Sequence, residues 1–230
     1  MSLIPARHPQ WESLDISKLV ALPTAFIPIG QANSLLSPDG AQKDERLWDR
    51  CRRKGGVLDN TLRLARASRE AGFKMIWFRY EIFRKHYPAT PLDEAQYRHW
   101  EESKPPLSDT QKKWDAKLID EVQQLIRPED PDMLYTSLTN IFLGTPLQGQ
   151  LSMWGVKTVL LCGYHLDWCV ESAARTARDL GFMPIVIGDA SACGREEDEA
   201  PTLDRINRFF APVVSTGEML ELIDRSRTKK

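Results

Sequence analysis

The residues best suited to chemistry lie in one short segment, GYHLDWCVESAARTARD, at positions 163–179. Its cysteine, Cys169, comes two residues after Asp167 and four after His165, so a nucleophile and two candidate bases are close in sequence. The segment follows the apolar run VKTVLLCG and keeps helical spacing as far as Gly181. We therefore expect Cys169 in the first turn of a helix, with Asp167 as the N-cap.

A helix start is a favourable place for a reactive thiol. Backbone N–H groups and the positive end of the helix dipole favour a thiolate, and the same donors can receive the oxyanion formed by attack on a carbonyl. The alternative is that Cys169 is a small buried core residue, which free cysteines often are. A base would come from His165 or Asp167, although a histidine in a turn is also a common capping or packing residue.

Substrate-binding residues are expected in the same turn and near the ends of two other strands. The candidates are Trp77, Arg79, Tyr80, Thr136, Phe142, Tyr164, Leu166 and Trp168. The tryptophans and tyrosines suit the core equally well, and Arg79, like Arg84, suits a surface ion pair as well as a substrate carboxylate.

Metal ligation has little support in the sequence. Glu81 and His86 are five residues apart, a poor spacing for a metal site, and the four cysteines, Cys51, Cys162, Cys169 and Cys193, form no C-x-x-C pair. We expect no metal and no cofactor.

Strand and helix patterns alternate from residue 24 onward. Six apolar runs predict strands: TAFIPI, FKMIWFRY, MLYT, VKTVLLCG, FMPIVIGD and PVVS. Helices are expected over 57–71, 109–125, 143–155, 168–180, 198–210 and 216–225. This alternation predicts one α/β domain with a doubly wound parallel sheet, whose active site lies at the carboxyl ends of the strands. Residues 1–22 are expected to form an arm on the surface or on a neighbouring subunit, and the Pro-rich stretch 84–108 a candidate lid.

Composition narrows the classes of function. The chain has 230 residues, 42% of them hydrophobic and 27% charged, which is enough for a real core and excludes general disorder. A formal charge of -1 excludes a bulk positive field for nucleic acid or an anionic membrane. No apolar run approaches the ~18 residues of a membrane helix, and the N-terminus lacks a signal-peptide pattern. We expect a cytoplasmic protein that recognises a small molecule.

The segment VKTVLLCGYHLDWCVESAARTARDLGFMPIVIGDASAC resembles the signature of the isochorismatase-like cysteine hydrolases, with its strand, G-x-x-x-D-x-C-V turn, helix, strand and D-A-x-A. SLTNIFLGTPLQGQLSMWG is similar to the family's S-A-F-x-G-T-x-L segment, and TAFIPIGQANSLLSPDG stands at its first strand and loop, so the resemblance spans 24–223. It implies a six-stranded parallel sheet in the order 3-2-1-4-5-6 and a homodimer or tetramer. It also implies an Asp-Lys-Cys triad that cleaves amides or, in one branch, a vinyl ether.

The resemblance places only one triad member in this chain. Cys169 matches the nucleophile, whereas the aspartate position corresponds to Gly30 and the lysine position to Thr136. The nearest carboxylate after Gly30 is Asp39, so a one-residue shift does not restore the aspartate. Losing members of a catalytic unit costs many powers of ten in rate. We expect Gly30→Asp with Thr136→Lys to move activity toward the family level.

Three functions are therefore compatible with the sequence. The first is a hydrolase with a rewired site, in which Cys169 attacks an amide, imide or ester and His165 or Asp167 serves as base. The second is a non-catalytic family member that binds a small ligand or a partner. The third is an isomerase or lyase variant that relies on a pocket acid.

Overall fold

The structure is a computed structural model and describes residues 3–41, 45–79, 90–102, 107–134 and 139–227. Its main sheet has five strands in the order β2-β1-β5-β6-β7, and every strand pair is parallel. These strands are β1 (Thr24–Ile29), β2 (Lys74–Met75), β5 (Thr158–Tyr164), β6 (Met183–Ala192) and β7 (Val213–Val214). A second, two-stranded parallel sheet pairs β3 (Trp77–Arg79) with β4 (Asp132–Leu134). The predicted α/β class with a parallel sheet is confirmed.

The sheet differs from the predicted six continuous strands at one point. The expected strand 73–80 is divided at Ile76, whose N–H still donates to the Phe26 carbonyl at 3.1 Å. The next bond of a parallel ladder would run from the N–H of residue 28 back to Ile76, but Pro28 has no N–H to donate. The chain therefore leaves β1 and pairs with β4 instead. With β2 and β3 counted as one strand, the order is the predicted 3-2-1-4-5-6.

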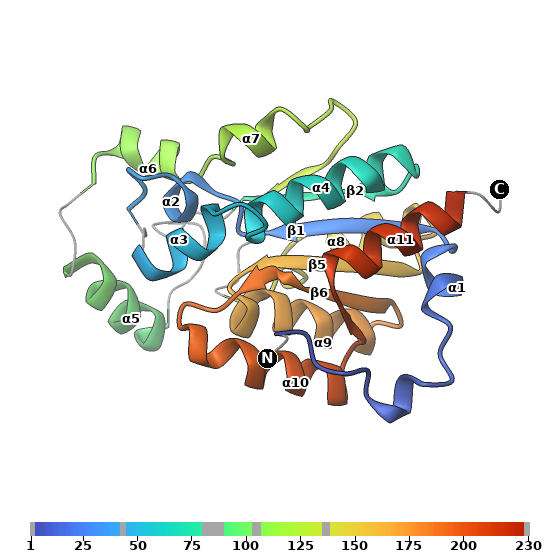
Figure 1. Ribbon diagram of the computed structural model, residues 1–230. Helices are drawn as coiled ribbons and strands as arrows, with labels where there is room; N and C mark the ends of the chain where they lie inside the picture. Colours follow the sequence, from blue (N-terminus) through green and yellow to red (C-terminus); the bar gives the residue numbers. More distant parts are fainter. Residues whose placement is uncertain (1–2, 42–44, 80–89, 103–106, 135–138, 228–230) are drawn as a thin grey trace.

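Helices cover both faces of the sheet (Figure 1). One face packs against α8 (Leu147–Met153), α9 (Glu171–Asp179) and α10 (Glu199–Phe209); the other packs against α1 (Ile16–Val20), α3 (Glu45–Arg52), α4 (Val57–Glu70) and α11 (Thr216–Arg227). The remaining helices are α2 (Asn33–Leu36), α5 (Pro91–Glu102), α6 (Asp109–Asp115) and α7 (Asp120–Gln123), with short turns η1 (Pro9–Trp11), η2 (Leu166–Val170) and η3 (Glu196–Asp198). Alternation along β1 divides the core, because Ala25, Ile27 and Ile29 face the α9 side and Phe26 faces the α4 side.

The predicted helix 109–125 is two helices, α6 and α7. Between them the backbone pairs with the loop after β1: Asn33 N–H donates to the Lys117 carbonyl at 2.8 Å, and Ile119 N–H donates to the Gln31 carbonyl at 2.9 Å. These long-range bonds use backbone groups that a continuous helix would need. Local helix propensity does not depend on such long-range bonds, so the break is absent from the sequence pattern.

The N-terminal arm lies on its own chain. Trp11 donates its indole N–H to the Asn207 carbonyl at 2.5 Å, and Asn207 donates back to the Ala6 carbonyl at 2.8 Å. Arg7 forms an ion pair with Glu218 at 2.6 Å. The arm thus covers the ends of α10 and α11, and the homo-oligomer stays a prediction.

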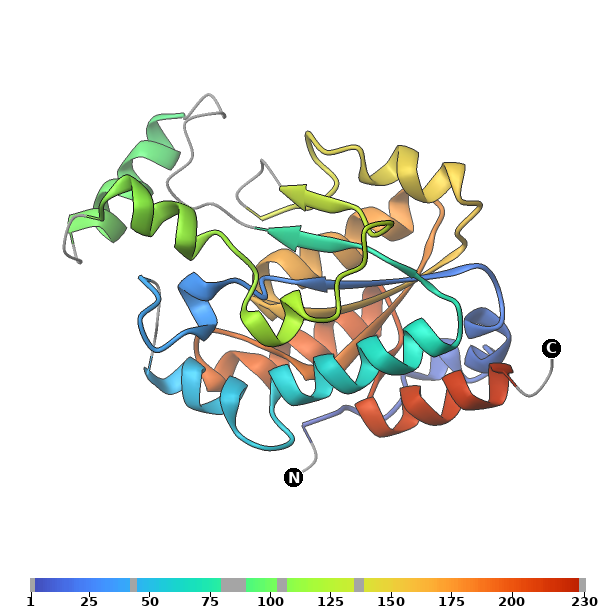
Figure 2. The same ribbon diagram turned by 90° about the horizontal axis from the view of Figure 1, so that it is seen from above.

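The candidate lid is described only in part. Residues 91–102 form α5, and residues 84–89 and 103–106 lie outside the described residues. In Figure 2, α5 lies toward the end of the molecule to which the arrows of β3 and β4 point. This is the carboxyl edge of the sheet, where the site was predicted.

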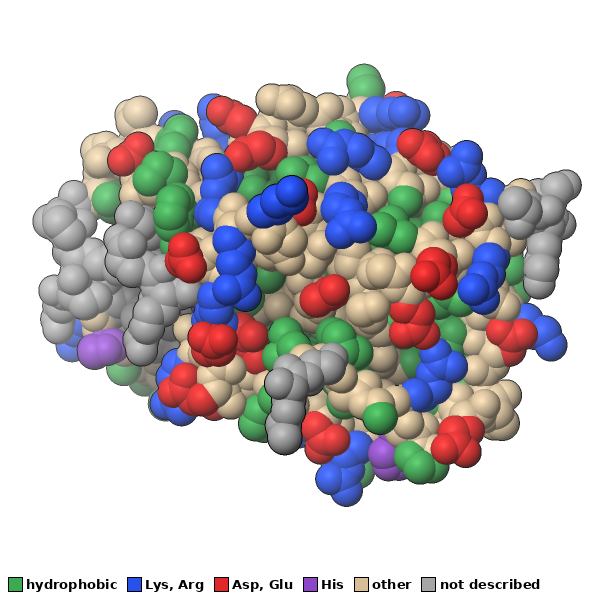
Figure 3. Space-filling model, in the orientation of Figure 1, with side chains coloured by type: hydrophobic (Ala, Val, Ile, Leu, Met, Phe, Trp, Pro, Cys, Tyr) green, Lys and Arg blue, Asp and Glu red, His purple; other side chains and the backbone are tan. Residues whose placement is uncertain are grey.

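The surface shown in Figure 3 carries basic and acidic side chains interspersed, without a large region of one sign. This pattern agrees with the near-neutral formal charge. None of the helices in the described residues is long and apolar enough to cross a membrane.

Candidate functional site

The site is built on the turn between β5 and α9. All seven residues of β5 are buried, the Tyr164–His165 peptide is cis, and η2 begins at Leu166 and runs directly into α9. The His165 carbonyl accepts the N–H groups of Trp168 and Val170, each at 3.2 Å. Cys169 therefore lies in the first helical turn at the carboxyl end of β5, as predicted, where the helix dipole favours an anion.

The predicted N-cap is wrong by two residues. His165 is the N-cap of η2, with extended backbone (φ -78°, ψ 140°), and Asp167 is already inside the helical turn. The helix starts earlier than the Asp-based prediction because the His165 carbonyl, rather than the Asp167 side chain, closes its first turn. The η2 turn is wider than an α-helical turn and has no side-chain cap. Capping preferences of the residue types therefore could not predict where it begins.

Cys169 is 3% exposed and belongs to the core cluster on the α9 side, with Leu166 and Val170. The next turns of the helix place Ala173, Ala174 and Ala177 against the sheet, all fully buried. These small residues let α9 approach the strands closely, which fixes the turn that carries the thiol.

His165 is half-buried and lies beside the same turn. Its ring contacts the Trp168 indole edge-on, with centroids 5.8 Å apart and planes at 62°. Gly194 is its neighbour on another side, because a Cβ added at that glycine would be 3.7 Å from the His165 Nδ1 atom. The imidazole is the candidate base four residues before Cys169.

Asp167 has a different environment. Residues two apart in a helical turn point to different faces, and Asp167 faces the Cys193 thiol rather than sharing the direction of Cys169. Burial first, and then the Asp167 charge, raise the pKa of Cys193 to about 12. One carboxylate oxygen of Asp167 is buried without a hydrogen-bond partner among the described residues. His165 and Asp167 both stay candidate bases for Cys169, and Asp167 also interacts with the Cys193 thiol.

Glu171, in the next turn, is a buried carboxylate held by two arginines. Arg205, from α10, donates to both of its oxygens at 2.8 and 2.7 Å, and Arg175 donates at 2.5 Å. Burial opposes ionisation, but the guanidinium groups of Arg205 and Arg175 outweigh it and hold the Glu171 pKa below its usual range. These bonds attach α10 to the helix start behind Cys169. The i,i+4 pair with Arg175 was visible in the sequence, whereas the Arg205 contact was not.

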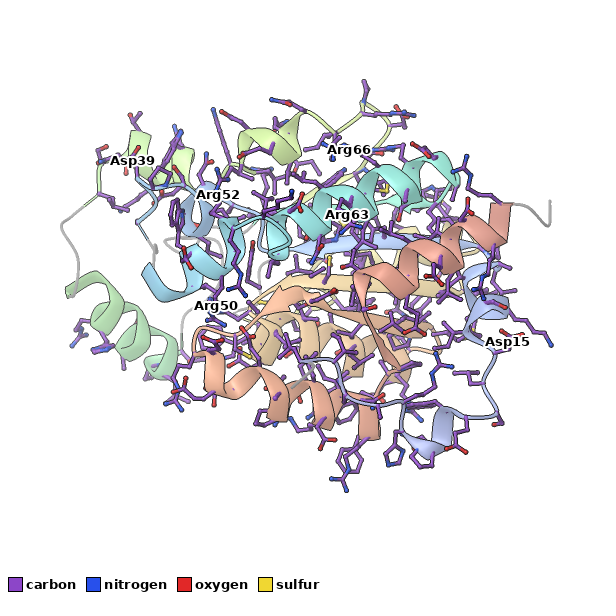
Figure 4. All side chains as sticks on the ribbon, in the orientation of Figure 1. Asp15, Asp39, Arg50, Arg52, Arg63 and Arg66 are labelled. Carbon is purple, nitrogen blue, oxygen red and sulfur yellow. The ribbon has the colours of Figure 1, made fainter. Side chains whose placement is uncertain are left out.

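A buried ion pair that the sequence did not reveal lies at the end of β6. Arg50, on α3, pairs with Glu199, and both side chains are nearly inaccessible to solvent. Arg50 Nη2 also donates to the carbonyls of Cys193 and Gly194 at 2.9 and 3.3 Å. Figure 4 shows Arg50 at the end of α3 that faces β6 and α10.

Gly30, at the position of the family aspartate, has φ +73°, and a Cβ there would lie 2.5 Å from the Tyr164 carbonyl oxygen. An aspartate at this position would combine left-handed strain with a backbone collision. This geometry counts against the expectation that Gly30→Asp, with Thr136→Lys, moves activity toward the family level, and the activity of the variant stays a prediction. Thr136, at the lysine position, lies outside the described residues.

Several predicted pocket residues are core residues instead. Trp77 is fully buried and donates its indole N–H to Asp130 at 3.0 Å, and Tyr164 is 1% exposed; both belong to the α4 side of the sheet, opposite Cys169. Phe142 stacks on Phe182 at 6.3 Å, beyond the far end of α9. Side chains at consecutive strand positions point to opposite faces of the sheet, and the choice of candidates from the sequence did not distinguish the two faces.

The remaining candidates divide into three groups. Arg79 forms a surface ion pair with Asp132 at 2.6 Å. Leu166 and Trp168 lie with Cys169, the first fully buried and the second half-buried against the same cluster. The others lie outside the described residues: Tyr80, Glu81, Arg84, His86 and Thr136. Among the residues that are described, no group of three or more His, Cys, Asp and Glu side chains could hold a metal ion.

A model of the Isochorismatase domain matches residues 35–218. This chain belongs to the isochorismatase family. Nicotinamidase 3 of Arabidopsis thaliana is 28% identical over 163 residues, covering 71% of this chain and 77% of its own length. The ureidoacrylate amidohydrolase RutB of Enterobacter sp. (strain 638) is 25% identical over 177 residues, covering 73% and 75%.

Other family members match over shorter stretches. The uncharacterized isochorismatase family protein YecD of Escherichia coli O157:H7 is 35% identical over 82 residues, and this match spans 36% of the chain and 44% of YecD. A cysteine hydrolase from Pseudomonas syringae pv. phaseolicola 1448A has the same fold, with a TM-score of 0.70 at 19% identity over 90% of this chain and 94% of that one. The family fold is thus shown, and the activity is a separate question.

Proposed function

We propose that this isochorismatase-family protein is a cysteine-dependent hydrolase that cleaves an amide or imide bond of a small molecule. The observation that carries the proposal is the position of Cys169, in the first turn of a helix at the carboxyl end of β5, with the His165 imidazole at the start of the same turn. The names of two relatives, a nicotinamidase and a ureidoacrylate amidohydrolase, support an amide.

In the proposed reaction His165 takes the proton of the Cys169 thiol, and the thiolate attacks the substrate carbonyl. Backbone N–H groups of the helix start stabilise the oxyanion, and the amine leaves with the proton that His165 returns. Water, activated by the same imidazole, then hydrolyses the thioester and regenerates the thiol. His165 thus replaces the aspartate whose position Gly30 occupies.

A second function, a non-catalytic member that binds a small ligand, is supported by the geometry at Gly30. The backbone at this position has no room for a side chain, so the residue that serves as base in the family is excluded rather than merely replaced. A protein that binds a ligand in this fold but does not catalyse its reaction needs no base at position 30. Under either function we propose that residues 84–108 close over the ligand and that the chain forms a homo-oligomer.

The hydrolase and the non-catalytic binding protein are distinguished by measuring turnover of a panel of small amides, imides and ureides that includes nicotinamide. We expect wild type and Cys162→Ala to hydrolyse at least one member equally, because Cys162 lies on the other side of the sheet. Cys169→Ala and His165→Gln should lose that activity. Ligand binding by wild type without turnover of any panel member would favour the second function, and full activity in Cys169→Ala would contradict the first.

A further inference from the structure

Arg50 places a buried positive charge at the carboxyl end of β6. Its side chain is 8% exposed and pairs with Glu199, which is 6% exposed. Its second guanidinium nitrogen donates to two consecutive backbone carbonyls, those of Cys193 and Gly194. Arg50 and Glu199 come from α3 and from the first residue of α10, so the pair attaches two separate helices to one short piece of backbone.

Stability alone is a weak explanation for this pair. Burying two charges is costly, and well-packed apolar residues in the place of a buried ion pair are often as stable or more stable. A guanidinium, in contrast, has a planar fork of donors that meets a carboxylate and two carbonyls in fixed directions, which an ammonium group cannot reproduce. The arrangement therefore fits the positioning of backbone atoms.

The backbone that Arg50 holds lies next to the His165 ring. A Cβ added at Gly194 would be 3.7 Å from Nδ1 and 3.8 Å from Cε1 of His165, so the ring is next to this glycine at the distance of one added methyl group. Trp168 contacts the same ring. A shift of the Gly194 backbone would therefore move or release the imidazole.

We infer that Arg50, with Glu199, is a positioning residue that holds the Cys193–Gly194 backbone and so orients the His165 imidazole beside Cys169. The inference rests on the proposed role of His165 as base. Its structural part, the coupling of Arg50 to the His165 ring, can be measured whether or not the protein turns over a substrate.

The reporter is the His165 ring in NMR spectra of the full-length protein. The edge-on Trp168 indole, 5.8 Å away, shifts the His165 Hε1 signal through its ring current, and the shift depends on the orientation of the two rings. His165→Gln assigns the signal among the four histidines. We expect Arg50→Lys and Glu199→Gln each to move the His165 signal and to leave those of His8 and His99 in place.

Arg69→Lys is the matched control. Arg69 also holds a buried carboxylate, that of Asp130, and a backbone carbonyl, that of Leu125 at 3.0 Å, but it lies on α4. The Arg69→Lys substitution should leave the His165 signal unchanged. If folded Arg50→Lys and Glu199→Gln both give the wild-type His165 signal, or if Arg69→Lys moves it equally, the inference is overturned.

Kinetics on a substrate from the panel supply a second readout. Arg50→Lys should lower kcat by about tenfold or more with KM nearly unchanged, because misplacing a catalytic group costs rate rather than ground-state binding. An unchanged kcat alongside a moved His165 signal would overturn the positioning role. Absence of turnover in wild type would count against the proposed hydrolase and leave the NMR test of the coupling intact.

Discussion

The Cα of Gly30 faces the carbonyl of Tyr164 so closely that a Cβ at position 30 would lie 2.5 Å from the carbonyl oxygen. Gly30 follows β1, and Tyr164 ends β5, its hydrogen-bonded neighbour. The ends of β1 and β5, beside the turn that carries Cys169, thus approach each other with backbone atoms and no side chain of residue 30 between them. The family's aspartate position is closed here by geometry as well as by residue type.

Because of this close approach, we expect even a methyl side chain at position 30 to destabilise the protein. Gly30→Ala combines left-handed strain with a collision and should lower the free energy of unfolding by about 3 kcal/mol. Gly72→Ala is the control, because Gly72 has φ +78° but open space around its Cα, so only the strain of about 1 kcal/mol applies. Urea denaturation measures both. Equal costs would contradict the close approach.

The same contact predicts that restoring the family triad fails. Gly30→Asp with Thr136→Lys should be less stable than wild type and should gain no amidase activity, because the aspartate cannot enter without moving the Tyr164 backbone. Thermal unfolding and nicotinamide hydrolysis check the two parts. A stable double variant with higher activity would show that the backbone at Gly30 adapts.

Buried thiols predict a loss of stability at alkaline pH. Burial raises the pKa of Cys51, Cys162 and Cys193 each to about 12, whereas an unfolded thiol ionises near pH ~8.5. The contribution of each thiol is complete below the unfolded pKa and is lost as pH rises toward the folded one. Between these values each thiol lowers the free energy of unfolding by about 1.4 kcal/mol per pH unit. Cys162→Ala should therefore have a slope less steep by about this amount in urea titrations between pH ~9.5 and ~11. Parallel slopes would contradict the burial of this thiol.

The ion pairs of Glu171 predict that the free energy of unfolding falls as the pH is lowered, opposite to the effect of the buried thiols. Its folded pKa is held below the usual value, so the stabilisation is present above pH ~4.3 and is lost as pH falls through the folded pKa. Glu171→Gln should cost about 2 kcal/mol at neutral pH, because its arginine partners are partly exposed and screened, and the difference from wild type should shrink below pH ~4.

Glu218→Gln, which breaks the exposed pair with Arg7, is the control and should cost under ~0.5 kcal/mol. Urea denaturation at pH ~7 and ~3 measures both variants. A cost for Glu171→Gln that is the same at both pH values would contradict the ion pairs at this carboxylate.

The parts of the site that the sequence predicted are those fixed by local patterns. The apolar run of β5 and the helical spacing after it located Cys169. The contacts that modify the site come from distant segments. Arg50 is more than 140 residues from its carbonyl partners, and the approach of Gly30 to Tyr164 joins two strands whose register no single pattern sets.

Face assignment was the other source of error. Trp77 and Tyr164 lie in strands close to the site, but their side chains point to the α4 side. A one-residue difference in phase reverses the face of a strand residue. Sequence spacing alone did not determine that phase.

The most direct test of the central claim is acylation by a small activated ester, p-nitrophenyl acetate, followed by mass spectrometry of the intact and digested protein. The Cys169 thiolate should attack the ester carbonyl and release p-nitrophenolate, forming an acetyl-Cys169 thioester that an acid quench within the first turnover traps before water hydrolyses it. Cys162→Ala should be acylated like wild type, His165→Gln much more slowly, and Cys169→Ala not at all. Acetyl groups found on other residues, or acylation of Cys169 at the same rate in His165→Gln, would contradict the account.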